Sequence, residues 1–348
     1  MYLLLPKLNK SLSQLLRTFL NYTYAQPRQL NERYMNVRIR SIQNITTTHK
    51  HQLHLFSRGY LLNNPNIYFT LDQVYQPSCF VYIELFNNHS LRTQIHCKPI
   101  SWTCVGDKYL DIQNAFNVID SSINQTYINT PLNVSSFDTI TTTEYFLSFY
   151  NDTVANYSMN LVLIDIDFTN TDKFERYSQE EVLLIYICYS VVRLCKDGNL
   201  VIKLPSEHFT ELMCEITMLM SSLFQQTYII HLNCDSGVEP TYFLICKSFQ
   251  YAQDGVIFKE MIGLFQNICH KPDDKYVSSI LNQNMPLYYR TKIDDILINM
   301  ISEHIDVLCN FHNYVLNKQH SKESLIRGKQ LNHTLKWLDM YNIPYTQK

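Results

Sequence analysis

The chain has 348 residues, 46% of them hydrophobic, and a formal net charge of -2. Such a chain can bury a sizeable core, so we expect a folded globular protein with one large domain or two smaller ones. The near-neutral balance excludes a global electrostatic attraction to nucleic acid. The longest apolar stretch, residues 182–194, is too short to cross a bilayer, so we expect no membrane segment.

The first 77 residues are predicted to form an N-terminal extension. Pro6 interrupts a short apolar run, which argues against a signal peptide, and apolar residues follow at helical spacing over 12–20. We therefore expect an amphipathic helix there. The extension also holds a basic run, for which a solvated face is the simpler interpretation and an RNA surface the alternative. Its members are Arg28, Arg33, Arg38, Arg40, Lys50 and Arg58.

From residue 78 the pattern changes to strand-like apolar runs. "CFVYIELF" at 79–86 and "ISWTCVG" at 100–106 are predicted strands, whereas residues 120–158 are rich in Ser, Thr and Asn and show little periodicity. "NLVLIDIDF" at 160–168 is almost continuously apolar. Such a run is expected for a strand that is covered on both faces of a parallel sheet.

A well-punctuated helix follows this strand. Ser178 and Glu181 form a predicted capping box at its start, and Gly198 is the predicted residue that ends it. "LVIKL" at 200–204 is the next strand. Strand, helix and strand in this order predict a βαβ unit of a parallel sheet.

A second helix is predicted over residues 207–224. Two strands at 227–232 and 241–249 follow, joined by the turn-forming sequence "NCDSGVEP". Residues 250–348 show helical spacing throughout, so we expect an all-helical C-terminal appendage. Trp337, Leu338 and Tyr341 would suit packing of this appendage on the sheet domain or on a partner.

The ten cysteines are scattered, and several lie in apolar segments predicted to be helices or strands. This distribution favours a reducing compartment over a disulfide framework. One of the two closest pairs, Cys97 and Cys104, lacks the spacing of a zinc site. We therefore expect a cytoplasmic protein without a metal site.

Three charged residues fall at or near the carboxyl ends of the predicted parallel strands, namely Asp165, Asp167 and Lys203. Ligands of open α/β sheets bind at these ends, so a carboxylate and a lysine are expected within reach of each other. A lysine tuned by burial and a nearby acid can help to remove a proton from a hydroxyl group. The alternative is an ion pair that only satisfies both charges.

The order of these elements resembles a known family. "LVLIDIDF", a capped helix, "DGNLVIKLP", a second helix and a hairpin ending in "YFLICKSF" resemble the FtsJ-like cap ribose 2′-O-methyltransferases, in the adrift-type branch that includes viral members. The resemblance covers residues 78–249 and implies a Rossmann-like methyltransferase sheet with helices on both faces. It also implies S-adenosylmethionine as cofactor and a Lys-Asp-Lys-Glu tetrad that deprotonates a ribose 2′-hydroxyl of capped RNA.

The resemblance assigns roles to particular residues. "IDID" and "DGNLVIK" match family strands, which gives Asp165 the place of the tetrad aspartate and Lys203 that of the central lysine. Glu239 is the candidate for the closing glutamate, displaced by one residue from the family's spacing. The first lysine has no counterpart in "FSRGYLLNN" at 56–64, where Arg58 stands and stays protonated, and Lys50 is a distant substitute.

For the cofactor, the resemblance matches "YIELFNN" at 82–88 to the family's first strand and glycine turn. Phe86 and two asparagines stand where the family has glycines, and their side chains would crowd the approach of the backbone to the cofactor. The residues assigned to the cofactor are Glu84, Asn87, Asn88 and Asp165.

Two functions follow as hypotheses. The first is an S-adenosylmethionine-dependent RNA cap 2′-O-methyltransferase, favoured by the retention of Asp165 and Lys203. The second is a catalytically inactive methyltransferase-like subunit that serves as a scaffold or RNA-binding partner in a viral capping or transcription complex, favoured by the altered glycine turn. An unrelated nucleotide-binding protein is disfavoured because the sequence has no GxGxxG or GxxxxGK motif. The branch implies the host cytoplasm, or the virion, as the location.

Overall fold

The computed structural model describes most of the chain from residue 69 onward and two short segments before it. The described residues are 2–7, 16–21, 69–71, 75–88, 91, 100–106, 108–119, 125–127, 136–156, 159–168, 176–205, 209–234, 241–252, 255–282, 284–316 and 323–347. Three features of the sequence lie outside these residues: the basic run of the N-terminal extension, the 56–64 segment, and Glu239.

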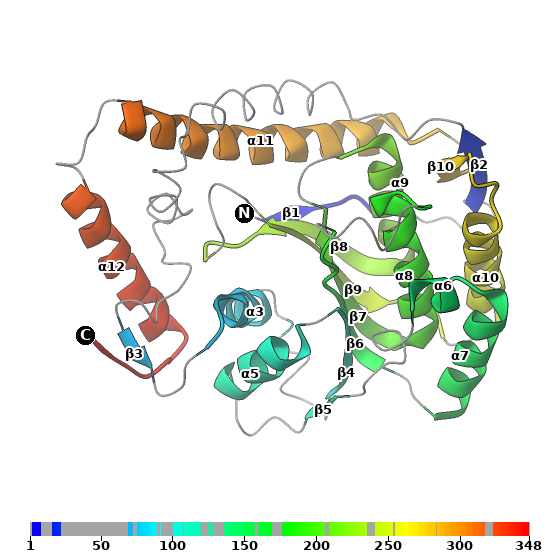
Figure 1. Ribbon diagram of the computed structural model, residues 1–348, viewed down its shortest axis with the longest axis horizontal. Coiled ribbons are helices and arrows are strands. Elements are labelled where there is room, and N and C mark those ends of the chain that lie inside the picture. Colours follow the sequence, from blue (N-terminus) through cyan, green and yellow to red (C-terminus); the bar gives the residue numbers. More distant parts are fainter. Residues whose placement is uncertain are drawn as a thin grey trace.

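A seven-stranded mixed sheet forms the centre of the molecule, with the order β1-β8-β9-β7-β6-β4-β5 (Figure 1). The strands β5, β4, β6 and β7 are parallel, and β9 is antiparallel to both β7 and β8. The chain leaves β4 to form β5 on one side and then returns to form β6 on the other, which makes β4 and β6 a topological switch point. The bounds are Tyr2–Leu4 for β1, Ile100–Val105 for β4, Gln125–Tyr127 for β5, Met159–Ile164 for β6, Leu194–Leu204 for β7, Phe224–His231 for β8 and Tyr242–Phe249 for β9.

Helices cover both faces of this sheet (Figure 1). Along β6, Leu161 and Leu163 face one hydrophobic core, whereas Val162 and Ile164 face the other. Burial on both faces explains the continuous apolar run of this strand. The topology thus confirms the expected Rossmann-like α/β fold. The core on one face includes residues of α3 (Pro77–Asn88) and α5 (Tyr109–Ile119), and the core on the other includes residues of α6 (Phe137–Ile140), α7 (Thr143–Asn156), α8 (Gln179–Arg193) and α9 (Glu211–Leu223).

The helix after β6 begins as predicted and ends earlier than predicted. Ser178 and Glu181 form the capping box of α8. Gly198 does not end this helix, because β7 starts at Leu194 and Gly198 lies within that strand. Asp197 has a φ of 64°, so the left-handed conformation that the sequence suggested for the glycine occurs one residue earlier.

Two predicted elements are wrong in type. Residues 79–86 form part of helix α3 and not a strand, and all except the half-buried Val81 are buried. A short apolar run enclosed by its neighbours shows neither helical nor strand periodicity, which explains the error. The helix expected over 12–20 is also wrong where it is described, because β2 (Leu16–Asn21) is a strand paired with β10 (Tyr276–Leu281).

The C-terminal region is mainly helical but not all-helical as expected; its helices are α10 (Gly255–Cys269), α11 (Leu287–Leu316) and α12 (Glu323–Met340). It also contains β10 and a short strand β11 (Tyr345–Gln347) that pairs with β3 (Phe69–Leu71). None of the helices in the described part of the chain is both long and apolar enough to span a membrane.

The expected packing of the C-terminal helices on the sheet domain is confirmed for α12. Trp337 packs edge-to-face on Phe80 of α3, with 5.9 Å between the ring centroids. Leu338 is fully buried in the same core. Large aromatic contacts of this kind contribute more than their buried area alone, so α12 is an integral part of the core on the α3 face.

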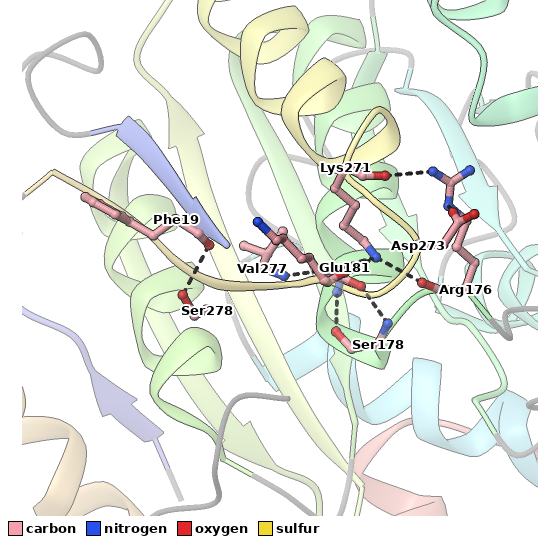
Figure 2. A network of polar contacts seen from close by, with 9 residues as sticks. Phe19, Arg176, Ser178, Glu181, Lys271, Asp273, Val277 and Ser278 are labelled. Atoms are coloured by element: carbon pink, nitrogen blue, oxygen red, sulfur yellow. Dashed lines mark hydrogen bonds and ion pairs between the residues drawn. The ribbon is translucent and has the colours of Figure 1, made fainter. Parts of the chain in front are cut away.

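A buried polar network joins α8 to the segment that leads into β10 (Figure 2). Lys271 donates to the carbonyl oxygens of Arg176 and Lys275 at 3.1 and 2.6 Å, and its Nζ lies 3.7 Å from Glu181 Oε1. The same Glu181 oxygen accepts the backbone N–H of Val277 at 2.7 Å. Burial raises the pKa of Glu181, whereas the backbone N–H groups of Val277 and Ser178 and the charge of Lys271 oppose this shift. The network therefore fixes β10 to the start of α8.

Candidate functional site

The predicted carboxylate and lysine meet at the ends of two neighbouring parallel strands. Ile164 of β6 lies beside Ile202 of β7 in the register, so the next residues, Asp165 and Lys203, fall side by side. Lys203 Nζ lies 2.9 Å from Asp165 Oδ1. Because side chains alternate along a strand, Lys203 points to the same face as Val201, the face covered by α3.

The two members of this pair differ in exposure. The side chain of Asp165 is 9% exposed and that of Lys203 is 32% exposed. The carboxylate is therefore buried, whereas the lysine side chain beside it is partly exposed. An arrangement of this kind holds a lysine in place and still lets a ligand reach it.

A glycine lies directly beside this pair at the end of β4. Gly106 has a φ of 121°, and a Cβ built on it would lie 2.0 Å from the carbonyl oxygen of Asp165. The backbone N–H of Asp165 in turn donates to the carbonyl of Val105 at 2.9 Å. A side chain at 106 would collide with the backbone after β6, so only glycine permits this close approach.

Gly106 therefore changes the predicted location of the glycine turn. The resemblance placed the first strand and its turn at 82–88, but those residues are the second half of α3. The strand that leads into the switch point is β4, and α5 begins at Tyr109, shortly after Gly106. A strand, a glycine and a helix N-terminus at the switch point form the arrangement in which α/β sheets bind ligands.

Glu84 has a different environment from the one expected. It is 1% exposed, and its two carboxylate oxygens accept the backbone N–H groups of Asn233 and Cys234, each at 2.9 Å. These residues follow β8, so Glu84 ties α3 to the turn after that strand. The expected position at the end of the first strand is wrong, and binding of a cofactor by Glu84 has no support in this geometry.

The other residues of the 86–88 segment also belong to α3. Phe86 is fully buried and stacks on Phe116 of α5, with 4.5 Å between centroids, so its ring fills the core and does not crowd a glycine turn. The Asn87 side chain donates to the carbonyl of Ile83 within the same helix. Asn88 is the last residue of α3, and its side chain lies outside the described residues.

A tyrosine that the sequence did not single out completes the described contacts of Asp165. The Tyr82 hydroxyl of α3 donates a hydrogen bond to Asp165 Oδ2, the oxygen that does not face Lys203. Burial raises the pKa of Tyr82 well above its usual value, and the negative charge of Asp165 raises it further. The phenol is therefore a protonated donor. It was missed because its segment was predicted to be a strand of another part of the sheet.

The described site allows one test of the fit to an S-adenosylmethionine cofactor. The end of β4 with Gly106 lies at the switch point where α/β sheets bind ligands, and the carbonyl oxygen of Asp165 takes the place where a Cβ of residue 106 would lie. Asp167 is exposed two residues after Asp165, on the same connection. Glu239 precedes β9 outside the described residues, so its assignment to the site stays a prediction.

No family model matches the sequence, and no curated protein matches it. Among solved structures, the chain is similar to a ribosomal RNA methyltransferase from Plasmodium falciparum, with 12% identity over 50% of this chain and 97% of that chain and a TM-score of 0.35. The chain is also similar to human methyltransferase-like protein 13 in complex with S-adenosylhomocysteine, with 11% identity over 63% of this chain and 96% of that chain and a TM-score of 0.27.

A Haemonchus contortus phosphoethanolamine N-methyltransferase 2, solved with phosphomonomethylethanolamine and S-adenosylhomocysteine, gives 9% identity over 48% of this chain and 38% of that chain, with a TM-score of 0.26. All three proteins are named as methyltransferases. Because the TM-scores are low, the assignment of the site rests on the geometry of Lys203, Asp165 and Gly106. The chain is thus a Rossmann-like α/β protein whose charged pair lies at the switch-point end of its parallel strands.

Proposed function

We propose that the chain is an S-adenosylmethionine-dependent methyltransferase that acts on a ribose 2′-hydroxyl of capped RNA. The observation that carries the proposal is the pair of Lys203 and Asp165 at the ends of β7 and β6, beside the glycine turn at the end of β4. The resemblance to FtsJ-like enzymes supports the substrate class, because the same two residues occupy the aspartate and central lysine places of the tetrad.

The residues of this chain would handle the proton of the reaction. S-adenosylmethionine would supply an electrophilic methyl group and leave as S-adenosylhomocysteine, and the end of β4 with Gly106, at the switch point, would hold that cofactor. Lys203, in its neutral form, accepts the proton of the ribose hydroxyl on Nζ. Asp165 then stabilises the ammonium group that results, since its Oδ1 lies 2.9 Å from Nζ. Alignment of the hydroxyl and the methyl group in one site supplies the remainder of the rate enhancement.

The second candidate is an inactive methyltransferase-like subunit of a capping or transcription complex. It is favoured by one observation: the second described partner of the Asp165 carboxylate is the neutral phenol of Tyr82 and not the further lysine that the tetrad implies. In this case the ion pair of Lys203 and Asp165 satisfies two charges and has no chemical role.

Titration calorimetry with S-adenosylmethionine and S-adenosylhomocysteine separates the two candidates, followed by methyl transfer to capped RNA. For the enzyme we expect micromolar binding and transfer that is lost in Lys203→Ala. The same RNA already methylated at its first 2′-hydroxyl is the matched substrate control and should accept no methyl group. Absence of binding at millimolar cofactor would refute the enzyme and leave the subunit.

A further inference from the structure

We propose that Tyr82 is a positioning residue for the Lys203–Asp165 pair, with α3 as a third structural element of the site. The inference rests on the proposed methyl transfer. The resemblance implies a second lysine in this cluster, and the described residues place a phenol on the carboxylate. Among the described residues, the site then holds one lysine and a neutral hydrogen-bond donor.

The contacts of Asp165 divide between its two oxygens. Oδ1 faces Lys203 of β7, and Oδ2 accepts the hydroxyl of Tyr82 from α3. A carboxylate held from both sides by two different elements has a fixed rotamer. Asp165 therefore presents Oδ1 to the lysine in a constant direction, which the transfer of a proton to or from Nζ requires.

The donor itself is held firmly. Tyr82 is 1% exposed, and its ring stacks on Phe86 one helical turn later, with 6.1 Å between centroids. Between these two residues, Glu84 fixes the same helix to the backbone of Asn233 and Cys234. The position of the phenol thus depends on α3 as a rigid body.

The charged and titratable groups around Tyr82 come from four elements. Asp165 follows β6, Lys203 is in β7, Asp111 is in the first turn of α5 and Cys104 is in β4. Asp111 accepts a short hydrogen bond from the Ser78 hydroxyl. The two acids and the thiol disfavour the phenolate, so Tyr82 stays a donor. A hydrogen bond donated to a carboxylate favours the ionised form of that carboxylate.

A second buried tyrosine shows what a purely structural hydroxyl does in this protein. Tyr189 of α8 donates to the backbone carbonyl of Ile140 at 2.6 Å, in the core on the opposite face of the sheet. The hydroxyl of Tyr82 is directed instead at a charged side chain at the end of a parallel strand. Tyr189 therefore provides a matched control for the loss of one buried hydroxyl.

The test compares Tyr82→Phe with Tyr189→Phe in the full chain. We expect Tyr82→Phe to lower kcat about 10- to 100-fold, the range for one hydrogen bond to a charged group, with KM for RNA and cofactor within about twofold. This split between kcat and KM separates positioning of the pair from the loss of a binding contact. Tyr189→Phe should leave kcat and both KM values unchanged at a temperature where it is folded.

A second measurement keeps this proposal separate from the proposed function. Carbon-13 NMR of labelled aspartate follows the Asp165 carboxyl carbon, assigned through Asp165→Asn, at one pH without cofactor or RNA. Its resonance should shift in Tyr82→Phe, which removes the hydrogen bond to Oδ2, and stay in place in Tyr189→Phe. An unmoved resonance would overturn the role of Tyr82, even in an active enzyme. A moved resonance in a protein that binds no cofactor would overturn the methyltransferase and keep the contact.

Discussion

Two lysines of this protein lie beside buried carboxylates, and their surroundings differ. Lys271 is fully enclosed: its side chain is 0% exposed, two carbonyl oxygens accept from it, and it lies over the rings of Tyr177 and Tyr276. Lys203 lies at the end of a strand with 32% of its side chain exposed, and Asp165 is its described partner.

The acids of the two pairs, Glu181 and Asp165, also differ in the groups that they bind. Glu181 uses its oxygens for the backbone N–H groups of Ser178 and Val277, so it joins two segments of the chain. Within the described part of the chain, the Asp165 carboxylate contacts side chains instead, those of Tyr82 and Lys203. The comparison teaches that a partly exposed lysine–carboxylate pair is a candidate for function, because a ligand can reach it. A pair that the chain encloses completely contributes to the stability of the fold instead.

The largest effect should come from Lys203→Arg. Arginine keeps the ion pair with Asp165 but cannot accept a proton, because its guanidinium stays charged. We expect methyl transfer to fall by about 10²- to 10⁴-fold while the free energy of unfolding changes by less than about 1 kcal/mol. Transfer rates and urea unfolding measure the two quantities. Lys196→Arg, on an exposed part of the same strand, is the control and should change neither.

The reverse pattern is expected for Lys271→Met. This change leaves the buried Glu181 without its cation and removes two hydrogen bonds to carbonyl oxygens. Breaking a buried pair in this way costs about 3–5 kcal/mol, so urea unfolding should show a loss of that size. Cofactor binding should persist at temperatures where the variant is folded. A variant as stable as the wild type would remove the distinction between the two lysines.

Gly106→Ala tests the backbone around the exposed pair without changing either charge. The added Cβ meets the carbonyl oxygen of Asp165, and the residue must keep a φ of 121° that alanine disfavours. We expect a loss of about 1–3 kcal/mol in stability and a weaker affinity for S-adenosylmethionine. Gly263→Ala, in α10 with open space around its Cβ position, is the control and should leave affinity unchanged.

The smallest effect concerns Glu215 of α9, a buried acid held by Ser279 and the backbone of Ile280. Burial raises its pKa above the usual value of 4.5, with the hydrogen bonds opposing the shift. The folded state therefore binds the proton more tightly than the unfolded state. Its contribution to stability is complete below pH 4.5 and declines as the pH rises through the raised pKa.

Urea unfolding between pH 4 and pH 8 tests this sign. The stability of the wild type relative to Glu215→Gln should fall with rising pH across this window. A difference that grows with pH instead would show that the hydrogen bonds from Ser279 and Ile280 outweigh burial.

The parts of the fold that local patterns specify were predictable. The βαβ unit around α8 was found because its strands are continuously apolar and its helix has a capping box at Ser178 and Glu181. The positions of Asp165 and Lys203 followed from strand ends alone. These features depend on residues close together in the sequence.

The predictions that were wrong concern elements whose structure depends on contacts between distant segments. Residues 16–21 form a strand because β10, more than 250 residues later, supplies its hydrogen-bonding partner. The sequence of α3 shows no helical pattern of apolar and polar residues, because its neighbours bury almost all of the helix. Tyr82 was missed for the same reason. Its one usable signal was the spacing of Tyr82 and Phe86, which are four residues apart and share a helical face.

The strand β1 affects the tendency of this protein to aggregate. Tyr2 to Leu4 pair with the outer edge of β8, and the backbone N–H of Leu5 extends the contact to Thr227. Without this cover, β8 would present a row of unpaired backbone groups next to a strongly hydrophobic sheet. Such an edge can pair with a strand of another molecule. By covering it, the short strand β1 lowers the tendency of the protein to aggregate.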